Sequence, residues 1–419
     1  MLNARFDVGL QTRTGMGDAL LSLKGLEVRR GMGVVLDGFS LDVHSGDVVV
    51  LQGVNGSGKS TVLESAARLL PLEKGSVHHG STMVVDFEGR RHMPSQPFGL
   101  TLQSNGMIGD ETVEDHLQTV CALSDMTADL TGILSSYGLE HRRHDRIAHL
   151  SGGQKRKVAV LAGLLPAMIS SEPRLIMLDE PDTGLDDNAI ASLVSNIAQL
   201  RMAGHGFLIA SHHATILDCA TRLHDLDGET GQTQDDDVVW EAIGTQSPAS
   251  FLSTRVGHRY MRHTRAGLAR NGLTGVIVVG VLLTLFNATS VEDQLWLVGM
   301  VLAVPFAVGL SGDPVVYILR EHRAIDWWRA HVNRLPSADL IGPLYGVVST
   351  GLCSLIFLNE LRWDLVFIGT AVLWASLTFV RFIELSTVRL ARPNAAFVRL
   401  LVPILILPWG LLVDYAASL

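Results

Sequence analysis

Apolar residues follow two different patterns along the 419 residues of this chain. Within residues 20–240, short apolar runs are separated by polar and Gly-rich segments, which is typical of a protein of alternating strands and helices. From residue 250 to the end, long apolar runs dominate, which is typical of helices that lie in a membrane. The pattern therefore predicts an α/β domain followed by an all-α transmembrane domain.

The α/β half contains both strand and helix patterns. Leu21–Val28 and Val34–Val43, with Gly31 and Gly33 between them, predict an antiparallel hairpin. Continuous apolar runs predict three buried strands: Asp47–Gln52, Arg174–Leu178 and Phe207–His212. Apolar residues at helical spacing predict three helices: Ser60–Leu70, Val113–Leu130 and Lys155–Leu165.

A Gly-rich loop, Gly53–Thr61, joins the first buried strand to the helix that follows it. In this strand–loop–helix setting, glycines let backbone N–H groups surround phosphates, and the start of the helix adds a favourable dipole. Lys59 is expected to reach the β- and γ-phosphates, and Ser60 to ligate Mg²⁺. The residues expected to contact the nucleotide in this loop are Gly53, Asn55, Gly56, Ser57, Gly58, Lys59, Ser60 and Thr61.

Two carboxylates follow the second buried strand, at the edge where open α/β sheets bind their ligands. Asp179 is predicted to hold Mg²⁺ through water, and Glu180 to orient or deprotonate an attacking water. His212 closes the third strand and is a further candidate at the same edge. Together these residues predict hydrolysis of a nucleoside triphosphate.

The segment Ser151-Gly152-Gly153-Gln154 opens the helix that runs through residues 155–165. Its small residues expose the positive end of that helix, which can contact a phosphate. This segment is far along the chain from the Gly-rich loop, and a phosphate contact within one subunit is hard to explain. Two subunits arranged head to tail solve the problem, because each supplies this helix end to the ATP of the other.

With these motifs in this order, residues 20–240 resemble the nucleotide-binding domain of an ABC transporter, and Leu150–Gln154 corresponds to the family signature. The resemblance implies an α/β P-loop NTPase fold with a helical subdomain, with ATP and Mg²⁺ as ligands. It identifies Gly53–Thr61 as the Walker A loop, Asp179 as the Walker B aspartate and Glu180 as the general base.

The resemblance also implies roles for three loops. Gln103, after the predicted strand Phe98–Leu102, matches the Q-loop glutamine that links Mg²⁺ to the membrane domain. Gly184-Leu185-Asp186 matches the D-loop, and His212 the switch histidine.

Three features depart from the family pattern. The family stacks adenine on an aromatic residue before the P-loop, but here Val28–Gly31 has none, and Arg30 is the residue that could stack through its guanidinium. Lys157 replaces the usual arginine after the signature, and the segment Pro166–Pro173 is longer than usual.

The second half contains five apolar runs long enough, or nearly long enough, to cross a membrane. They are Leu273–Leu285, Leu295–Leu310, Leu340–Leu358, Leu365–Val380 and Leu400–Val413. The last run is interrupted by Pro403 and Pro408, so it either spans with a kink or dips into one leaflet. We therefore expect a transmembrane domain of four to six helices.

Segments rich in arginine alternate with segments poor in arginine along this half, as the positive-inside rule expects. This places the ATPase domain in the cytoplasm of a multi-pass protein of the plasma membrane.

Phe251–Leu268 carries apolar and basic faces like an interfacial helix. The loop Arg320–Pro336 resembles the charged segment of ABC-2-type exporters, in which a short helix docks on the ATPase. Trp327-Trp328 in it is interpreted as an interfacial anchor or docking contact rather than an aromatic ligand surface.

Composition narrows the classes of function. The formal net charge of −9 argues against nucleic-acid binding, which needs a basic face. The three cysteines are far apart and have no CxxC spacing, so we expect reduced, packed thiols. The N-terminus lacks the apolar core of a signal peptide, which agrees with a cytoplasmic ATPase domain.

The predicted organisation is an N-terminal extension (1–19), a nucleotide-binding domain (20–240), a linker (241–250), an interfacial helix (251–270) and a transmembrane domain (271–419). The acidic, Gly-rich stretch Asp227–Asp237 is also interpreted as linker.

The predicted function is a homodimeric ABC half-transporter that exports a hydrophobic or amphipathic substrate. Its expected partners are a second copy of the chain and the lipid bilayer, and no nucleic acid. One alternative is an ATPase subunit that energises a separate permease, and within that class the ATPase half is weakly similar to the haem exporter ATPase of cytochrome c maturation. Another is a membrane-tethered ABC ATPase that acts on a protein partner.

Overall fold

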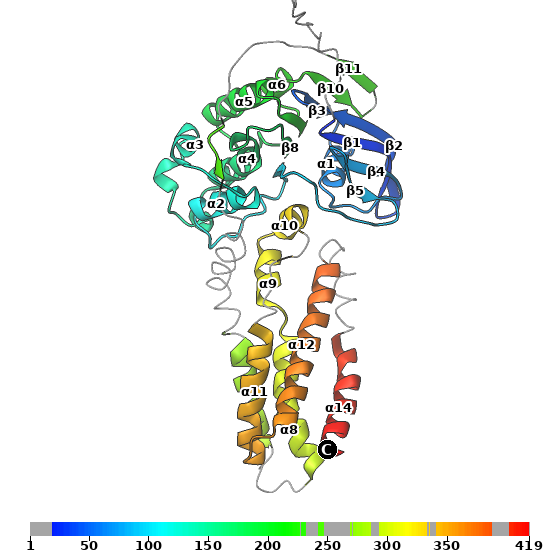
Figure 1. Cartoon of the computed structure of the whole chain (residues 1–419), viewed down its shortest axis with the longest axis vertical. Coiled ribbons are helices and arrows are strands. Elements are labelled where there is room, and N and C mark those ends of the chain that lie inside the picture. Colours follow the sequence, from blue (N-terminus) through cyan, green and yellow to red (C-terminus); the bar gives the residue numbers. More distant parts are fainter. Residues whose placement is uncertain are drawn as a thin grey trace, which may run out of the picture.

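The computed structural model describes residues 19–226, 228–231, 242–246, 269, 271–285, 293–332, 335, 341–387 and 402–418. An α/β domain lies at one end and a bundle of long helices at the other, with two short helices between them (Figure 1). Two predicted segments, the N-terminal extension up to residue 18 and nearly all of the interfacial helix 251–270, lie outside the described residues.

An antiparallel sheet of four strands begins the α/β domain, in the order β2-β1-β4-β5. The strands are β1 (Leu21–Arg30), β2 (Gly33–Val43), β4 (Lys74–His79) and β5 (Thr82–Asp86). β1 and β2 pair antiparallel, with Arg30 opposite Gly33, so the predicted hairpin is confirmed.

A six-stranded sheet forms the centre of the domain, in the order β11-β10-β3-β9-β8-β6. Its strands are β3 (Val48–Gln52), β6 (Gly99–Thr101), β8 (Leu175–Asp179), β9 (Gly206–Ala210), β10 (Arg222–Asp225) and β11 (Gly228–Gly231). β3, β9 and β8 pair in parallel and are almost wholly buried, as their apolar runs predict. Because parallel strands end at one edge, the loops after β3, β8 and β9 meet there.

The strand that was predicted to end at His212 is shorter than expected. β9 ends at Ala210, so His212 lies in the following loop, and Ser211 between them is buried with its hydroxyl bonded to Asp182 Oδ1 at 2.7 Å. This side-chain bond, rather than strand pairing, therefore fixes the start of the loop that carries His212.

Helices pack on both sides of the six-stranded sheet and in a lobe beside it (Figure 1). They are α1 (Lys59–Ala66), α2 (Val113–Leu123), α3 (Thr131–Ser136), α4 (Gly152–Met168), α5 (Asp187–Met202) and α6 (Ala214–Leu217), with short 3-10 turns at Glu140–Arg142 and Ile147–His149. This arrangement agrees with the predicted α/β fold with a helical subdomain.

Several helix ends differ from the prediction. α1 stops at Ala66 instead of Leu70, because Arg68 adopts a positive φ of 65° that a helix cannot continue through. α2 stops at Leu123, before Asp125 with φ 54°. α4 in contrast continues through Pro166 to Met168, since its side chains are buried all round there and tertiary packing outweighs the lost hydrogen bond.

Parts of the stretches predicted as linker pair as strands. β11 pairs with β10, so Gly228–Gly231 belongs to the central sheet. β12 (Thr245–Gln246) pairs with β7 (Met126–Thr127), which ties the segment before the membrane half to the helical lobe.

The second half is a helical bundle around its own apolar core. Its helices are Asn271–Leu285, α8 (Gln294–Leu310), α11 (Ile341–Leu358), α12 (Trp363–Ser386) and α14 (Ile406–Ser418), the last preceded by the 3-10 turn Val402–Leu405. Among the described residues, the stretches Gln294–Glu321 and Trp363–Ser386 are long and apolar enough to cross a membrane, and the other apolar helices are shorter. Small residues let α11 and α12 approach closely, since a Cβ on Gly369 would lie 2.2 Å from Thr350 Oγ1.

Two short helices connect the bundle to the α/β domain (Figure 1). α9 (Pro314–Glu321) is capped by Asp313, whose carboxylate accepts from Val315 N at 2.8 Å. α10 (Ile325–His331) then packs into the core of the α/β domain, where Trp327 and Trp328 are only 2% and 4% exposed. The interpretation of these tryptophans as a docking contact is therefore confirmed.

Candidate nucleotide site

The loop between β3 and α1 has a conformation that only glycine adopts easily. Gly56 and Gly58 have φ of 89° and 108°, and a Cβ on Gly53 would lie 2.8 Å from Ser57 Oγ. Ser57 Oγ is buried and has no hydrogen-bond partner among the described residues. The glycines therefore open a cradle, and an unpaired buried hydroxyl within it fits a phosphate oxygen.

Lys59 begins α1 and bends back over this loop. Its Nζ donates to the carbonyl oxygens of Gly53 at 2.6 Å and Val54 at 3.0 Å, and the residue is 7% exposed. Among the described residues, the partners of this buried ammonium are carbonyl oxygens, which carry no full negative charge, and phosphate oxygens could supply that charge.

Ser60 and Asp179 come from different elements and meet at the edge of the sheet. Ser60 Oγ donates to Asp179 Oδ1 at 3.1 Å. Burial raises the pKa of Asp179 to about 6, with a further rise from Glu180, while the Ser60 hydrogen bond opposes the shift. A hydroxyl beside a carboxylate is a hard oxygen pair of the kind Mg²⁺ prefers, so these residues fit the predicted ion.

Glu180 follows Asp179 directly and has an unusual backbone. Its φ is 46°, in the left-handed region, and its N–H donates to Ala210 O of β9 at 2.8 Å. The side chain is only partly exposed. A non-glycine residue held in this region next to a candidate metal ligand is typical of a functional position.

Gln103 and His212 occupy loops at the same edge of the sheet. Gln103 follows β6, which neighbours β8, and His212 follows β9, which lies between β3 and β8. Both side chains are exposed. The strand order thus brings their loops near Asp179, while their roles stay predictions.

The Ser151 end of α4 is closed by a reciprocal pair of hydrogen bonds and lies on the surface. Ser151 Oγ accepts from Gln154 N at 3.2 Å, and Gln154 Oε1 accepts from Ser151 N at 3.0 Å. Ser151 and Gly152 are exposed. A Cβ on Gly153 would lie 2.8 Å from Gly184 O, so the signature packs against the predicted D-loop of its own chain.

Asp186 and Arg30 both have partners within the chain. Asp186 caps α5 by accepting from Ala189 N at 2.9 Å, and it also pairs with Lys157 Nζ at 2.5 Å. Arg30 forms an ion pair with Glu64 of α1 at 2.9 Å and is 44% exposed in its side chain. Arg30 therefore lies beside the P-loop helix, where stacking on adenine remains a prediction.

Sequence reasoning missed Arg156 of α4. This residue is 6% exposed and donates to the carbonyl oxygens of both Asp179 and Glu180, at 2.5 and 2.8 Å. It lies between two lysines, as an ordinary surface cation would, and only its spacing on the buried face of α4 could have indicated otherwise.

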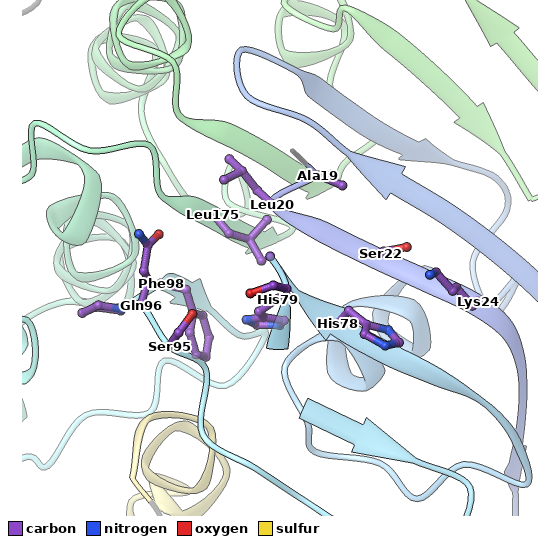
Figure 2. A pocket seen from close by; sticks show the side chains of 13 residues that line it. Ala19, Leu20, Ser22, Lys24, His78, His79, Ser95, Gln96, Phe98 and Leu175 are labelled. Carbon is purple, nitrogen blue, oxygen red and sulfur yellow. The ribbon is translucent and has the colours of Figure 1, made fainter. Parts of the chain in front are cut away.

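A cavity of about 600 Å³ lies elsewhere in the domain, between β1, β4, the loop before β6 and the start of β8 (Figure 2). Its wall includes Phe98, whose ring also stacks on His331 of α10 at 4.9 Å. None of the predicted nucleotide residues lines it. We therefore place the nucleotide site from the P-loop geometry rather than from this cavity.

Comparison with known proteins supports this assignment. Residues 36–183 match the family described as ABC transporter. The macrolide export ATP-binding/permease protein MacB of Azoarcus sp. (strain BH72) is 27% identical over 290 residues, which cover 64% of this chain and 43% of that protein, so the chain spans less than half of its length. The putative ABC transporter ATP-binding protein VNG_2317G of Halobacterium salinarum is 32% identical over 202 residues, which cover 46% of this chain and 82% of that protein.

Solved structures show the same likeness at lower identity. The dimeric structure of a bacterial ABC transporter cassette is 18% identical with a TM-score of 0.43, and the match covers 51% of this chain and 100% of that chain. The family match and the coverage of the Halobacterium relative, taken with the P-loop and the residues around Asp179, establish that the chain belongs to the ABC transporter family and that its α/β domain is an ABC-type ATPase.

Proposed function

We propose that the chain is a homodimeric half-transporter that couples ATP binding and hydrolysis to export of a hydrophobic or amphipathic molecule. The observation that carries the proposal is the position of α10, which is joined to the apolar helices through α9 and buried in the core of the ATPase domain. Energy released at the nucleotide site thus has a direct mechanical route to the bundle.

Each chemical role falls to a residue at the edge of the central sheet. Lys59 and the P-loop amides bind the phosphates, and Ser60 with Asp179 would hold Mg²⁺, which neutralises phosphate charge. Glu180 orients the attacking water and accepts its proton. From the adjoining loops, His212 would serve as the switch histidine, and Gln103 would help to hold Mg²⁺ and link it to the membrane domain.

The second copy of the chain completes the nucleotide site. Ser151 and Gly152 are exposed at the positive end of α4, away from their own P-loop in sequence. Two domains facing head to tail bring each of these ends to the ATP of the other subunit. ATP binding therefore closes the dimer, and hydrolysis releases it.

Movement passes to the bundle through the loop after β6. A Cβ on Gly106 would lie 2.7 Å from Trp327 Cβ, and a Cβ on Gly109 would lie 2.9 Å from His322 Cε1. These close contacts lie three and six residues beyond Gln103 in the chain. A shift of this loop on nucleotide binding therefore displaces α10.

Export is favoured over import because ATPase and apolar helices share one chain, as the name ATP-binding/permease states for the macrolide exporter. A separate permease energised by this chain is the second candidate. The observation that favours it is that two of the apolar helices in the described part of the chain, Gln294–Glu321 and Trp363–Ser386, are long and apolar enough to cross a membrane.

Reconstitution of the purified chain in liposomes tests the proposal. ATPase activity that rises when candidate lipids or amphipathic compounds are added, with no second polypeptide, is the expected result. Activity that stays silent until a permease is supplied would instead establish the second candidate. Glu180→Gln in the same liposomes is the control, since it separates this hydrolysis from that of a contaminant.

A further inference from the structure

One buried side chain connects three parts of the ATPase domain. Arg156 of α4 donates through Nη1 to Leu102 O at 2.8 Å and to Asn105 Oδ1 at 3.1 Å. Through Nη2 it donates to Asp179 O at 2.5 Å and Glu180 O at 2.8 Å. One guanidinium thus joins the signature helix, the loop after β6 and the end of β8.

The bonds to β8 act on a backbone that needs support. Glu180 has φ 46°, in the left-handed region, where the Cβ of a non-glycine residue comes too close to the following carbonyl oxygen. Its N–H is held by Ala210 O at 2.8 Å, and its carbonyl is held by Arg156. Because both sides of the residue are fixed, the direction of its Cα–Cβ bond is fixed as well.

The bonds to the loop after β6 lead toward the membrane half. Asn105 precedes Gly106, and Gly106 packs directly on Trp327 of α10. A displacement of α10 therefore moves the same short loop to which Arg156 donates hydrogen bonds, at Leu102 O and Asn105 Oδ1.

We propose that Arg156 is a positioning residue that holds Glu180 in its left-handed conformation and links that conformation to the position of α10. The proposal deepens the proposed function and rests on it, since it takes Glu180 as the group that acts on water. A guanidinium is suited to this task because its two terminal nitrogens serve two segments at once, whereas a lysine has a single nitrogen.

The test measures steady-state ATP hydrolysis and nucleotide binding of the full chain in liposomes, for Arg156→Met and Arg156→Lys. ATP binding and KM should change by less than about threefold, because the P-loop is intact, while kcat of Arg156→Met should fall by about tenfold or more. Arg156→Lys should recover part of kcat, since it keeps the charge but can reach only one of the two segments.

Arg174→Met is the matched control. Arg174 is also largely buried, with 14% of its side chain exposed, but it lies just before the start of β8 and donates to Ser170 Oγ at 2.9 Å. The Arg174→Met variant should lose thermal stability, and its kcat should change little. A kcat for Arg156→Met within about twofold of the native chain, or an equal fall for Arg174→Met, would overturn the positioning role. A fully active Arg156→Lys would overturn it too, which keeps the test decisive if the methionine variant does not fold.

A double-mutant cycle tests the link to α10. Trp327→Ala should change kcat in the native chain and add no further change in Arg156→Met, because the connection is already broken. Independent, additive effects would contradict the link. Failure of this inference is distinct from failure of the proposed function: ATPase activity that stays silent in liposomes until a permease is supplied removes the proposed function, whereas an inactive Glu180→Gln with a fully active Arg156→Met removes only the inference.

Discussion

Lys59 and Glu180 lie at one site and are predicted to have separate roles, in ATP binding and in hydrolysis. Substitution of each residue can distinguish the two roles. Glu180→Gln should retain ATP while turnover stops, because the amide cannot accept a proton from water. Lys59→Ala should lose ATP binding, because it removes the buried ammonium that is predicted to bind the phosphates. Equilibrium binding of labelled ATP and the rate of phosphate release measure the two effects. A normal rate of release from Glu180→Gln would show that the general base is another group.

The sequence predicts most of this site because its motifs encode backbone conformation. Glycines of positive φ specify the cradle, and a carboxylate after a buried strand specifies the sheet edge, where Ser60 indeed meets Asp179. Arg156 could not be found in this way. Its acceptors include three backbone carbonyl oxygens, and a carbonyl carries no signature in the sequence.

At the scale of elements, α10 depends on a close approach that only glycine allows. Gly106 has φ 69°, and a Cβ there would lie 2.7 Å from Trp327 Cβ. Gly106→Ala should therefore displace α10, at a cost of about 1–3 kcal/mol, and reduce stimulation of the ATPase by lipid. ATP binding should be unchanged.

Gly132→Ala in α3 is the control for this substitution, since a Cβ there meets nothing within 4 Å in the described part of the chain. Stimulated ATPase rates and protease cleavage around α10 report the result. Equal stimulation of the ATPase by lipid in both variants would contradict a role for the Gly106–Trp327 contact in coupling the bundle to the ATPase domain.

His331 makes the docking of α10 sensitive to acid. Burial lowers the pKa of His331 to about 4, against a partly opposing hydrogen bond to Trp327 O. Because the folded pKa is depressed from 6.5, the neutral ring contributes its full stability above about pH 6.5, and this is lost as pH falls toward 4. Between pH 7 and pH 5 the loss is about 2 kcal/mol.

His331→Phe should remove this part of the acid sensitivity while keeping an aromatic ring against Phe98. Unfolding free energies of both proteins at the two pH values provide the measurement. His79 and His205, whose pKa values burial also lowers to about 4, add a background that both proteins share. Parallel acid profiles for the two proteins would show that His331 does not titrate on unfolding.

Helices and strands with a strong periodic pattern of apolar residues could be predicted from the sequence, but the residues at which they end could not. The hairpin and the buried strands follow from apolar patterns that survive any tertiary context. The ends of α1 and α2 depend on Arg68 and Asp125, non-glycine residues with positive φ. Asp adopts this region more readily than most residues, but its presence alone does not locate a helix end. β12 is only two residues long and forms because β7 is there to pair with it.

At the scale of the whole molecule, the described residues form two apolar cores, and α9 and α10 lie between them. The bundle has its own core, while α10 belongs to the core of the ATPase domain. Charge patterns and apolar runs predicted the order of these parts. The contact between them depends on the shapes of Trp327 and Gly106, which a single sequence does not relate to each other.

The central claim is that two copies of the chain share each nucleotide, and complementation between two inactive variants tests it. Lys59→Ala disables the P-loop. Gly152→Asp places a negative charge at the exposed end of α4, where a Cβ meets nothing within 4 Å among the described residues of its own chain. Each variant alone should be inactive.

The decisive measurement is ATP hydrolysis by heterodimers of these two variants, purified through different tags. Shared sites predict recovered hydrolysis, because the intact P-loop of one chain meets the intact helix end of the other. Heterodimers as inactive as either parent would contradict the account, since both defects would then act within their own subunits.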